Sequence, residues 1–403
     1  MARRTPTLAA PLRQLTLTDR VNALARRAEV VDPGRPALCL FGIVLALLGL
    51  GLLMQVSHAA TTLPEDAFQA KLKDLVVFRM AGLFVLLVAA RLGPQGIRRY
   101  VPALTVLALA MLLAVYLPGL RRSVNGSGRW VDIPLIPFHV QPSEFARVIG
   151  VLWVARRCAQ LGDRVQEGRS GYLPLLAVGA AFAGLILFEP DFGGAMLFLL
   201  CYVVTMWTAG ARPAHLATSA AAGVAGAALI GAVGTFAHVR ERVAVWLGES
   251  TNEQVVHAAE AVASGDLFGV GVAQGASRQQ GLQYMQTDYA LSLVGEELGF
   301  AGVLLVVGLY LAFLWYGLQL VLSVKDRYVA VAAFGLLVSV AFQAMLHLQV
   351  VTQLAPPKGM NLPFLSDGGS ALLAACLAVG LALGAARHNS NQRSSMPLGG
   401  ELR

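Results

Sequence analysis

The sequence predicts an all-α polytopic membrane protein with about ten transmembrane helices, on three observations. Hydrophobic residues make up 56% of the 403 residues and charged residues only 13%, well below the roughly 25% of a soluble domain. Apolar runs of about 20 residues, long enough to cross the hydrocarbon layer as helices, recur along the whole chain. Their strength is typical of helices and unlike the weak alternation of a transmembrane barrel. We place these runs at 37–57, 73–92, 100–118, 143–160, 172–188, 192–210, 214–238, 288–318, 328–353 and 368–386.

The distribution of basic residues predicts the orientation. An even number of spans places both termini on one side of the membrane. With both termini in the cytoplasm, the inner segments hold 20 lysines and arginines and the outer segments hold 9, as the positive-inside rule requires. The net charge of +8 is therefore mostly a topology signal, and we expect no nucleic-acid partner.

The chain reads as one membrane domain with two polar tails. Residues 1–36 and 388–403 are the expected cytoplasmic tails, and 37–387 the ten-helix domain. The first tail is too long and too charged for a secretory signal, so the first apolar run is expected to remain as a span. The largest outer loop, 239–287, lies between the seventh and eighth spans, and its helical spacing over 252–266 predicts a helix.

Several chemistries are not expected. The four cysteines lie in or beside the predicted helices and give neither a disulfide framework nor metal-ligand spacing. The sequence holds no phosphate-binding GxxxxGK[ST] loop, so ATP-driven transport by this chain alone is not expected.

Ionisable residues in or beside the spans are the candidate functional residues, because each costs at least ~2.5 kcal/mol at the bilayer centre on insertion scales. Glu144 and Arg147 in "QPSEFARV" are three residues apart, so they share a helix face and can pair. They are either a structural ion pair or part of an anion or sugar site. Arg79, in the second span, needs a partner from another helix or a ligand phosphate, which a guanidinium binds through two oxygens.

Two further turns carry polar residues. Pro190 and two glycines in "FEPDFGG" predict a tight outward turn that holds Glu189 and Asp191, with Asp191 alternatively a polar hairpin tip. Lys358 is the only basic residue of "PPKGMNLPFLSDGGS". Ser370 ends this string at the start of the last span, where free backbone N–H groups can bind an anion.

The string "QTDYALSLVGEELGF" holds three acids, Asp288, Glu296 and Glu297. On a helix, Glu296 lies about 80° round from Asp288 and ~12 Å deeper, so we do not expect a catalytic carboxylate pair. Asp288, at the outer end of the eighth span, is either a general base or a helix N-cap. Glu296 and Glu297 are expected within the span, in a structural polar network.

Taken in this order, six strings resemble the SEDS family, that is FtsW, RodA and their relatives such as SpoVE. The strings are "NGSGRW", "QPSEFAR", "EPDFG", "GVGVAQGAS", "TDYALSLVGEELGFAG" and "PPKGMNLPFLSDGGSALL", and they cover most of residues 125–373. The resemblance implies a peptidoglycan glycosyltransferase that polymerises lipid II into a nascent glycan strand at the outer face of the bacterial cytoplasmic membrane. It also implies a class B penicillin-binding protein as partner, with other division or elongation proteins.

The resemblance carries over to particular residues. The family's essential aspartate falls on Asp288 in "TDY", and the Glu and Lys of its "QPSE..K" string fall on Glu144 and Arg147. Lys358 in "PPKG" is closer to FtsW than to RodA. The departures "QQGLQYMQTDY" and "SDGGSAL", where FtsW-like proteins read "KxxYLPEAHTDF" and "SYGGSSL", indicate a divergent member.

The residue roles expected from sequence are therefore as follows: Asp288 is the catalytic base; Arg79, Glu144, Arg147, Lys358 and Ser370 bind substrate; and Trp130, Gln141, Glu189, Asp191, Glu296 and Glu297 form the supporting polar network. No cofactor is required by the sequence. Arg79, Arg147, Lys358 or a divalent cation, Mg²⁺ or Mn²⁺, is expected to stabilise the diphosphate leaving group.

Two alternatives remain open at this point. A flippase or transporter of lipid-linked sugars would also carry charges within helices, but near the middle of the membrane. A non-catalytic division scaffold would not need Asp288.

Overall fold

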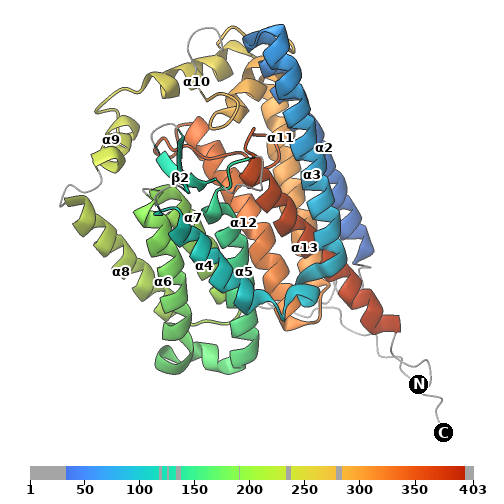
Figure 1. Ribbon diagram of the computed structural model, residues 1–403, viewed down its shortest axis with the longest axis vertical. Helices are drawn as coiled ribbons and strands as arrows, with labels where there is room; N and C mark the ends of the chain where they lie inside the picture. Colours follow the sequence, from blue (N-terminus) through green and yellow to red (C-terminus); the bar gives the residue numbers. More distant parts are fainter. Residues whose placement is uncertain are drawn as a thin grey trace, which may run out of the picture.

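The computed structural model describes residues 33–117, 120–124, 127–132, 138–189, 191–232, 237–277 and 284–394. Most of both predicted tails therefore lies outside the described residues, as does Pro190 of the predicted "FEPDFGG" turn. The described chain forms a bundle of long helices with short elements gathered at one end (Figure 1).

Within the described residues, every predicted apolar run corresponds to a helix. These helices are α2 (Gly34–Thr62), α3 (Glu65–Ile97), α4 (Val101–Ala114), α5 (Pro142–Leu161), α6 (Leu173–Phe188), α7 (Phe192–Thr208), α8 (Pro213–Ala232), α11 (Ala290–Leu322), α12 (Arg327–Val351) and α13 (Gly369–Ser394). In the described part of the chain, six segments are long and apolar enough to cross a membrane, whereas α4 and α7 are apolar but shorter. The all-α polytopic fold is confirmed, and the number of ten spans stays a prediction.

Close backbone contact joins α3 to α13. A Cβ atom at Gly380 would collide with the Leu86 carbonyl oxygen, and one at Gly384 would collide with the backbone of Gly93. Small residues allow such approach between membrane helices. Gly93 has φ 61° and precedes Pro94, so α3 kinks near its end.

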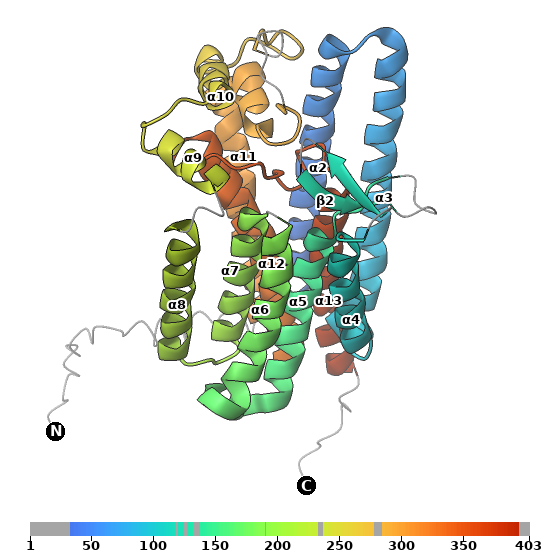
Figure 2. The ribbon, with the colours of Figure 1, turned by 60° about the vertical axis from the view of Figure 1, so that its left-hand side comes forward.

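Most of the short elements lie at the end of the bundle where α5, α7 and α13 begin (Figure 2). They include α9 (Ala237–Trp246), α10 (Glu253–Ser264), β1 (Arg121–Val124) and β2 (Ser127–Val131). The helix predicted over 252–266 is confirmed as α10, whose N-cap is the Asn252 side chain. The antiparallel β1–β2 hairpin, in which Arg122 pairs with Trp130, is an addition to the predicted all-α architecture. Two short helical turns, Gly162–Gln166 and Gly168–Tyr172, connect α5 to α6 at the opposite end.

One predicted span differs in the structure. Residues 288–318 were expected to form one helix, but α11 begins at Ala290 and is broken at Gly299, which has φ 67°. The segment 265–271 satisfies the peptide groups of the break. Val270 N–H donates to the Glu296 carbonyl at 3.0 Å, and Phe300 N–H donates to the Asp266 carbonyl at 2.9 Å.

The second part of α11, 300–322, is about 34 Å long at 1.5 Å per residue and is long enough to cross the hydrocarbon layer by itself. Glu296 and Glu297 lie before the break, in the first part of α11, and their place within the span stays a prediction. The hydropathy pattern does not reveal the break in α11, because a single glycine breaks the helix without interrupting the apolar run.

Candidate active site

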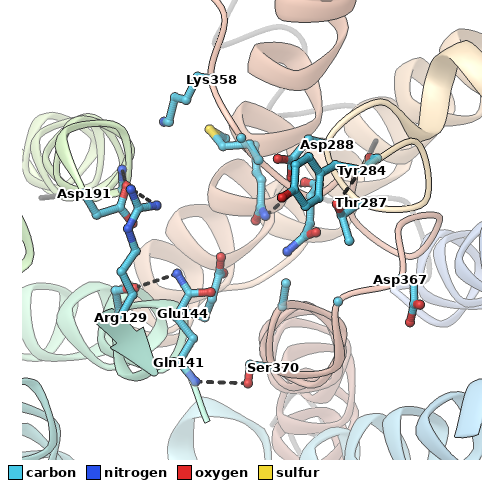
Figure 3. Close-up of a pocket in the computed structure, with 18 of the residues that line it drawn as sticks. Arg129, Gln141, Glu144, Asp191, Tyr284, Thr287, Asp288, Lys358, Asp367 and Ser370 are labelled. Carbon is cyan, nitrogen blue, oxygen red and sulfur yellow. Dashed lines mark hydrogen bonds and ion pairs between the residues drawn. The ribbon is translucent and has the colours of Figure 1, made fainter. Parts of the chain in front are cut away.

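A cavity of about 590 Å³ opens among the N-terminal ends of α5, α7 and α13. It lies on the side of the bundle that carries the hairpin and α9. Its wall comes from segments far apart in the sequence, including β2, the turn 284–289 and the loop 355–368 (Figure 3). The structure brings eight of the twelve sequence-predicted site residues to this cavity: Trp130, Gln141, Glu144, Arg147, Asp191, Asp288, Lys358 and Ser370.

Asp288 lies in a turn directly before α11. The N-cap of that helix is Tyr289, so Asp288 is not the helix cap that the sequence allowed. Burial raises the pKa of Asp288 above its ordinary value, and a hydrogen bond from Thr287 and the charges of Arg129 and Arg242 offset part of this rise. A carboxylate with a raised pKa accepts a proton more readily near neutral pH than an exposed one.

Hydrogen bonds to the loop 355–368 hold the Asp288 turn in place. The Ser366 hydroxyl donates to the Thr287 carbonyl at 2.6 Å, and Asp367 N–H donates to the Gln286 carbonyl at 2.8 Å. The backbone of Gly359 lies against the Asp288 carboxylate, since a Cβ atom there would be 2.6 Å from Oδ2. The base is therefore positioned by the same loop that carries Lys358.

Lys358 reaches the cavity without a hydrogen-bond partner among the described residues. Its Nζ is buried, and its side chain packs against Gly193 so closely that a Cβ atom there would collide with it. Burial lowers the pKa of Lys358 to about 8, although Asp191 raises it in part. A buried, unpaired ammonium group is suited to receive an anionic group of a ligand.

The predicted pairing of Glu144 and Arg147 is confirmed, with 2.8 Å between Arg147 Nη2 and Glu144 Oε2. The same Arg147 nitrogen donates to Gln343 Oε1 at 2.6 Å, and the Gln343 amide donates to the Asn361 carbonyl at 3.2 Å. This chain of contacts connects α5 to α12 and the loop 355–368. Arg147 is thus already bound within the protein, which favours the structural reading of the pair.

Asp191 and Ser370 also make contacts within the protein. Asp191 accepts from Gly194 N–H at 2.8 Å as the N-cap of α7 and lies 3.4 Å from the guanidinium of Arg129. The Ser370 hydroxyl accepts from Gln141 N–H and donates to the His139 carbonyl, both at 3.1 Å. These bonds tie the beginnings of α7 and α13 to the hairpin and to the residues that follow it.

Four predicted site residues do not line the cavity: Arg79, Glu189, Glu296 and Glu297. Arg79 is buried in α3, where its Nε donates to the Leu48 carbonyl at 3.4 Å and its Nη1 to the Leu75 carbonyl at 3.3 Å. Substrate binding by Arg79 therefore lacks geometric support.

The three buried glutamates lie in separate surroundings. Glu189 is the C-cap of α6, and neither carboxylate oxygen has a hydrogen-bond partner among the described residues. Burial and Asp191 raise the pKa of Glu189 to about 8. Glu296 accepts from Ser277 N–H at 2.8 Å, and Glu297 accepts from the Ser57 hydroxyl at 2.6 Å. Asp288 and the two glutamates of its string are therefore not one carboxylate site.

Sequence reasoning missed two arginines of the cavity. Arg129 comes from β2 and Arg242 from α9, and both act electrostatically on Asp288. Arg129 lies within "NGSGRW", one of the strings that resemble the family, so the sequence held a signal for its role in the site. Arg242 has no local signal, because only the folding of α9 over the cavity brings it near.

A divalent cation has no dedicated set of ligands in the part of the chain that the structure describes, where no group of three or more His, Cys, Asp or Glu side chains is placed to hold one. A Mg²⁺ ion bound mainly through substrate phosphates needs only one or two carboxylates. The cation therefore stays a prediction.

Comparison with known proteins assigns the family. The family model of FtsW, RodA and SpoVE, described as a cell cycle protein, matches residues 37–391. The chain belongs to the FtsW/RodA/SpoVE family. Among its relatives, a probable peptidoglycan glycosyltransferase FtsW of Trichlorobacter lovleyi is 30% identical over 86% of this chain and 92% of the relative. Stage V sporulation protein E of Bacillus subtilis is 30% identical over 88% of this chain and 98% of its own length.

Solved structures share the fold of this FtsW/RodA/SpoVE member. One, described as "Structural coordination of polymerization and crosslinking by a peptidoglycan synthase complex", has a TM-score of 0.69 at 24% identity, covering 87% of this chain and 97% of that one. The rod shape determining protein RodA of Thermus thermophilus has a TM-score of 0.61 at 24% identity, covering 87% and 96%. The polytopic helical fold predicted from the apolar runs is thereby confirmed.

Proposed function

We propose that this protein is a peptidoglycan glycosyltransferase that polymerises lipid II into glycan strands. The observation that carries the proposal is the placement of Asp288 in a polar cavity with Lys358, Arg129 and Arg242. An inverting sugar transfer needs one base and a stabilised leaving group, and this cavity offers both. The relatives named glycosyltransferases support the same reaction.

In the reaction, the Asp288 carboxylate accepts the proton of the acceptor sugar's 4-hydroxyl. The oxygen attacks the anomeric carbon of the donor, the new C–O bond forms, and the bond to the lipid pyrophosphate breaks. A β-linkage formed from an α-phosphate donor requires inversion, so a single carboxylate suffices. Glycosidases that act on neutral leaving groups need a second carboxyl group as acid.

The leaving group departs as a lipid diphosphate, so it needs positive charge more than a proton. Lys358 is the best-placed cation, because its Nζ is buried in the cavity wall without a hydrogen-bond partner among the described residues. Arg129 and Arg242 add charge from the hairpin and from α9. Arg147 is held by Glu144 and Gln343, so we assign it to positioning the cavity wall.

We place the cavity on the outer side of the bacterial cytoplasmic membrane. The excess of basic residues in the predicted inner segments supports this orientation. The cavity opens at one end of the bundle, where an enzyme acting on a lipid-linked headgroup needs it. A transporter would be expected to bind its cargo near mid-membrane.

We further expect a partner that cross-links the new strands, namely a class B penicillin-binding protein, together with other division or elongation proteins. The neighbour described as coordinating polymerization and crosslinking in one complex supports such a pairing. The outer elements α9 and α10 are available to contact a partner, because much of their surface is exposed.

The test is polymer formation from lipid II by the purified protein with its penicillin-binding protein, followed on gels as glycan length. Asp288→Asn is expected to lower the rate by roughly 100- to 10,000-fold, the usual contribution of a general base, while leaving partner binding and thermal stability unchanged. Polymer at the wild-type rate from this variant would refute the base assignment. Movement of lipid II across vesicles without polymer would support the transporter.

Asp266→Asn is the matched control. Asp266 is an exposed acid of the 239–287 segment, with a φ of 47° that asparagine tolerates. It removes the same charge outside the cavity and should leave the rate unchanged.

A further inference from the structure

A second pocket lies at the opposite end of the bundle from the proposed active site. It measures about 470 Å³ and is lined by Gln95, Gly96, Arg98, Arg99, Arg156 and Gln160. The first four residues belong to the end of α3 and its turn into α4, and the last two to the end of α5. Since α5 begins at the active-site cavity, its end lies on the predicted cytoplasmic side (Figure 2).

The pocket concentrates positive charge without a bound counter-charge. Within the described residues, no carboxylate lies within ion-pair distance of Arg98, Arg99 or Arg156. Asp326 is the nearby acid, since its charge acts on Tyr328 in opposition to the charges of Arg98 and Arg156, and its side chain serves as the N-cap of α12. Three guanidinium groups at one pocket repel one another unless an anion binds between them.

Aromatic rings hold two of the arginines in place. The Arg98 guanidinium lies over the Tyr328 ring at 4.9 Å from its centroid. The Arg99 guanidinium lies over the Tyr100 ring at 4.5 Å and donates to the Tyr100 hydroxyl. Stacking on one face leaves the edge of the Arg98 guanidinium free to bind phosphate oxygens in a bidentate manner, so the pocket is prepared for a phosphate group.

Two glutamines supply neutral polar groups. Gln160 Oε1 accepts from Arg157 at 3.1 Å, which leaves the Gln160 amide nitrogen as a donor at the pocket. Gln95 Oε1 is buried without a hydrogen-bond partner among the described residues and suits a hydroxyl donor. A ligand that carries both phosphate and hydroxyl groups would satisfy both side chains.

The surroundings of the pocket are those of a lipid and not of a soluble anion. Leu92 and Tyr100 beside the pocket are exposed, as are Val106 and Leu107 further along α4. Acyl chains can lie along this apolar face while the headgroup reaches the arginines. Basic pockets between helices on the cytoplasmic side of membrane proteins bind anionic headgroups in this way.

From these observations we infer that this pocket binds the phosphate-bearing headgroup of an anionic phospholipid of the cytoplasmic leaflet. The site is separate from the proposed active site and does not depend on the proposed reaction. Part of the positive-inside bias is thereby concentrated at one place, because Arg98 and Arg99 after α3 and Arg156 of α5 line a single pocket.

The test measures lipid retention by native mass spectrometry of the full-length protein titrated with phosphatidylglycerol or cardiolipin, with phosphatidylcholine as the neutral comparison. The variant is Arg98→Gln/Arg99→Gln/Arg156→Gln. The matched control is Arg164→Gln/Arg169→Gln/Arg212→Gln, which removes the same charge from exposed arginines of the same predicted side outside the pocket. Thermal unfolding in lipid-free detergent checks that both variants fold.

We expect the pocket variant to bind the anionic lipids more weakly by on the order of 100-fold, equivalent to about 2.7 kcal/mol, with the control close to wild type. Equal losses in the two variants would overturn the site, because the lipid would then sense only net charge. Displacement of the lipid by millimolar inorganic phosphate would overturn the lipid assignment in favour of a free anion. Retention of phosphatidylcholine as strongly as phosphatidylglycerol would overturn it as well.

Discussion

Substitution of Gly359 by alanine tests the position of the proposed base without changing its chemistry. Gly359 lies in an exposed part of the loop 355–368, and its φ is outside the range that demands glycine. The added Cβ atom would be 2.6 Å from Asp288 Oδ2 and 3.2 Å from Cγ. The substitution therefore acts mainly on the Asp288 carboxylate.

The structure gives the size of the displacement. Ordinary van der Waals contact of a Cβ atom begins at 3.4 Å, so the carboxylate or the loop must shift by about 0.8 Å. Misplacement of a reacting group by about 1 Å can cost on the order of 100-fold in rate. We expect Gly359→Ala to lower kcat by roughly 10- to 100-fold, with a smaller change in KM and little change in Tm.

The assay is the initial rate of glycan polymer formation from lipid II, with Gly308→Ala as control because an added Cβ there meets nothing within 4 Å. Gly359→Ala combined with Asp288→Asn should be no slower than Asp288→Asn alone, since both act through one group. A Gly359→Ala enzyme with the full rate would refute the reasoning. So would a further loss in the double variant.

Further predictions concern pH and stability. Because burial raises the pKa of Asp288, the acidic limb of the kcat/KM profile should lie above the usual carboxyl range, with activity lost as pH falls through it. Lys358, with a pKa of about 8, should set an alkaline limb of the kcat/KM profile near that pH. Lys358→Arg should move this limb to higher pH, because arginine stays charged. An alkaline limb that does not move would exclude Lys358 as the group that titrates there. The native state holds the Glu189 proton more tightly than the unfolded state, so stability should fall as pH rises from about 4.5 to about 8. Glu189→Gln should flatten that dependence in thermal melts, and a slope equal to that of wild type would contradict it. Arg147→Met should lower the free energy of unfolding by about 3 kcal/mol, because it removes a buried guanidinium and leaves the half-buried Glu144 carboxylate unpaired. Adding Glu144→Gln should restore part of this in denaturant titrations, and no recovery would argue against the pair.

The sequence was sufficient for what depends on local pattern. Apolar runs located the membrane helices because burial in lipid demands about 20 apolar residues regardless of neighbours. The three-residue spacing of Glu144 and Arg147 predicted their pairing, because residues three apart share a helix face. Asp288 could be singled out because it follows a polar loop and opens an apolar run.

Features that depend on long-range packing were not accessible in this way. Arg79 was expected to need either a partner from another helix or a ligand phosphate, and the sequence could not show that α2 supplies the Leu48 carbonyl as a partner. Arg242 reaches the cavity only through the folding of α9. The break at Gly299 depends on hydrogen bonds from residues about 30 positions earlier, which hydropathy does not detect.

That break also makes two parts of the outer region a single cooperative unit. Gly269 and Gly299 lie so close together that a Cβ atom on either would collide with the backbone of the opposite segment. The amides of Val270, Phe300 and Ala301 are protected only while both segments are in place. Hydrogen exchange at these amides should therefore occur in one opening event.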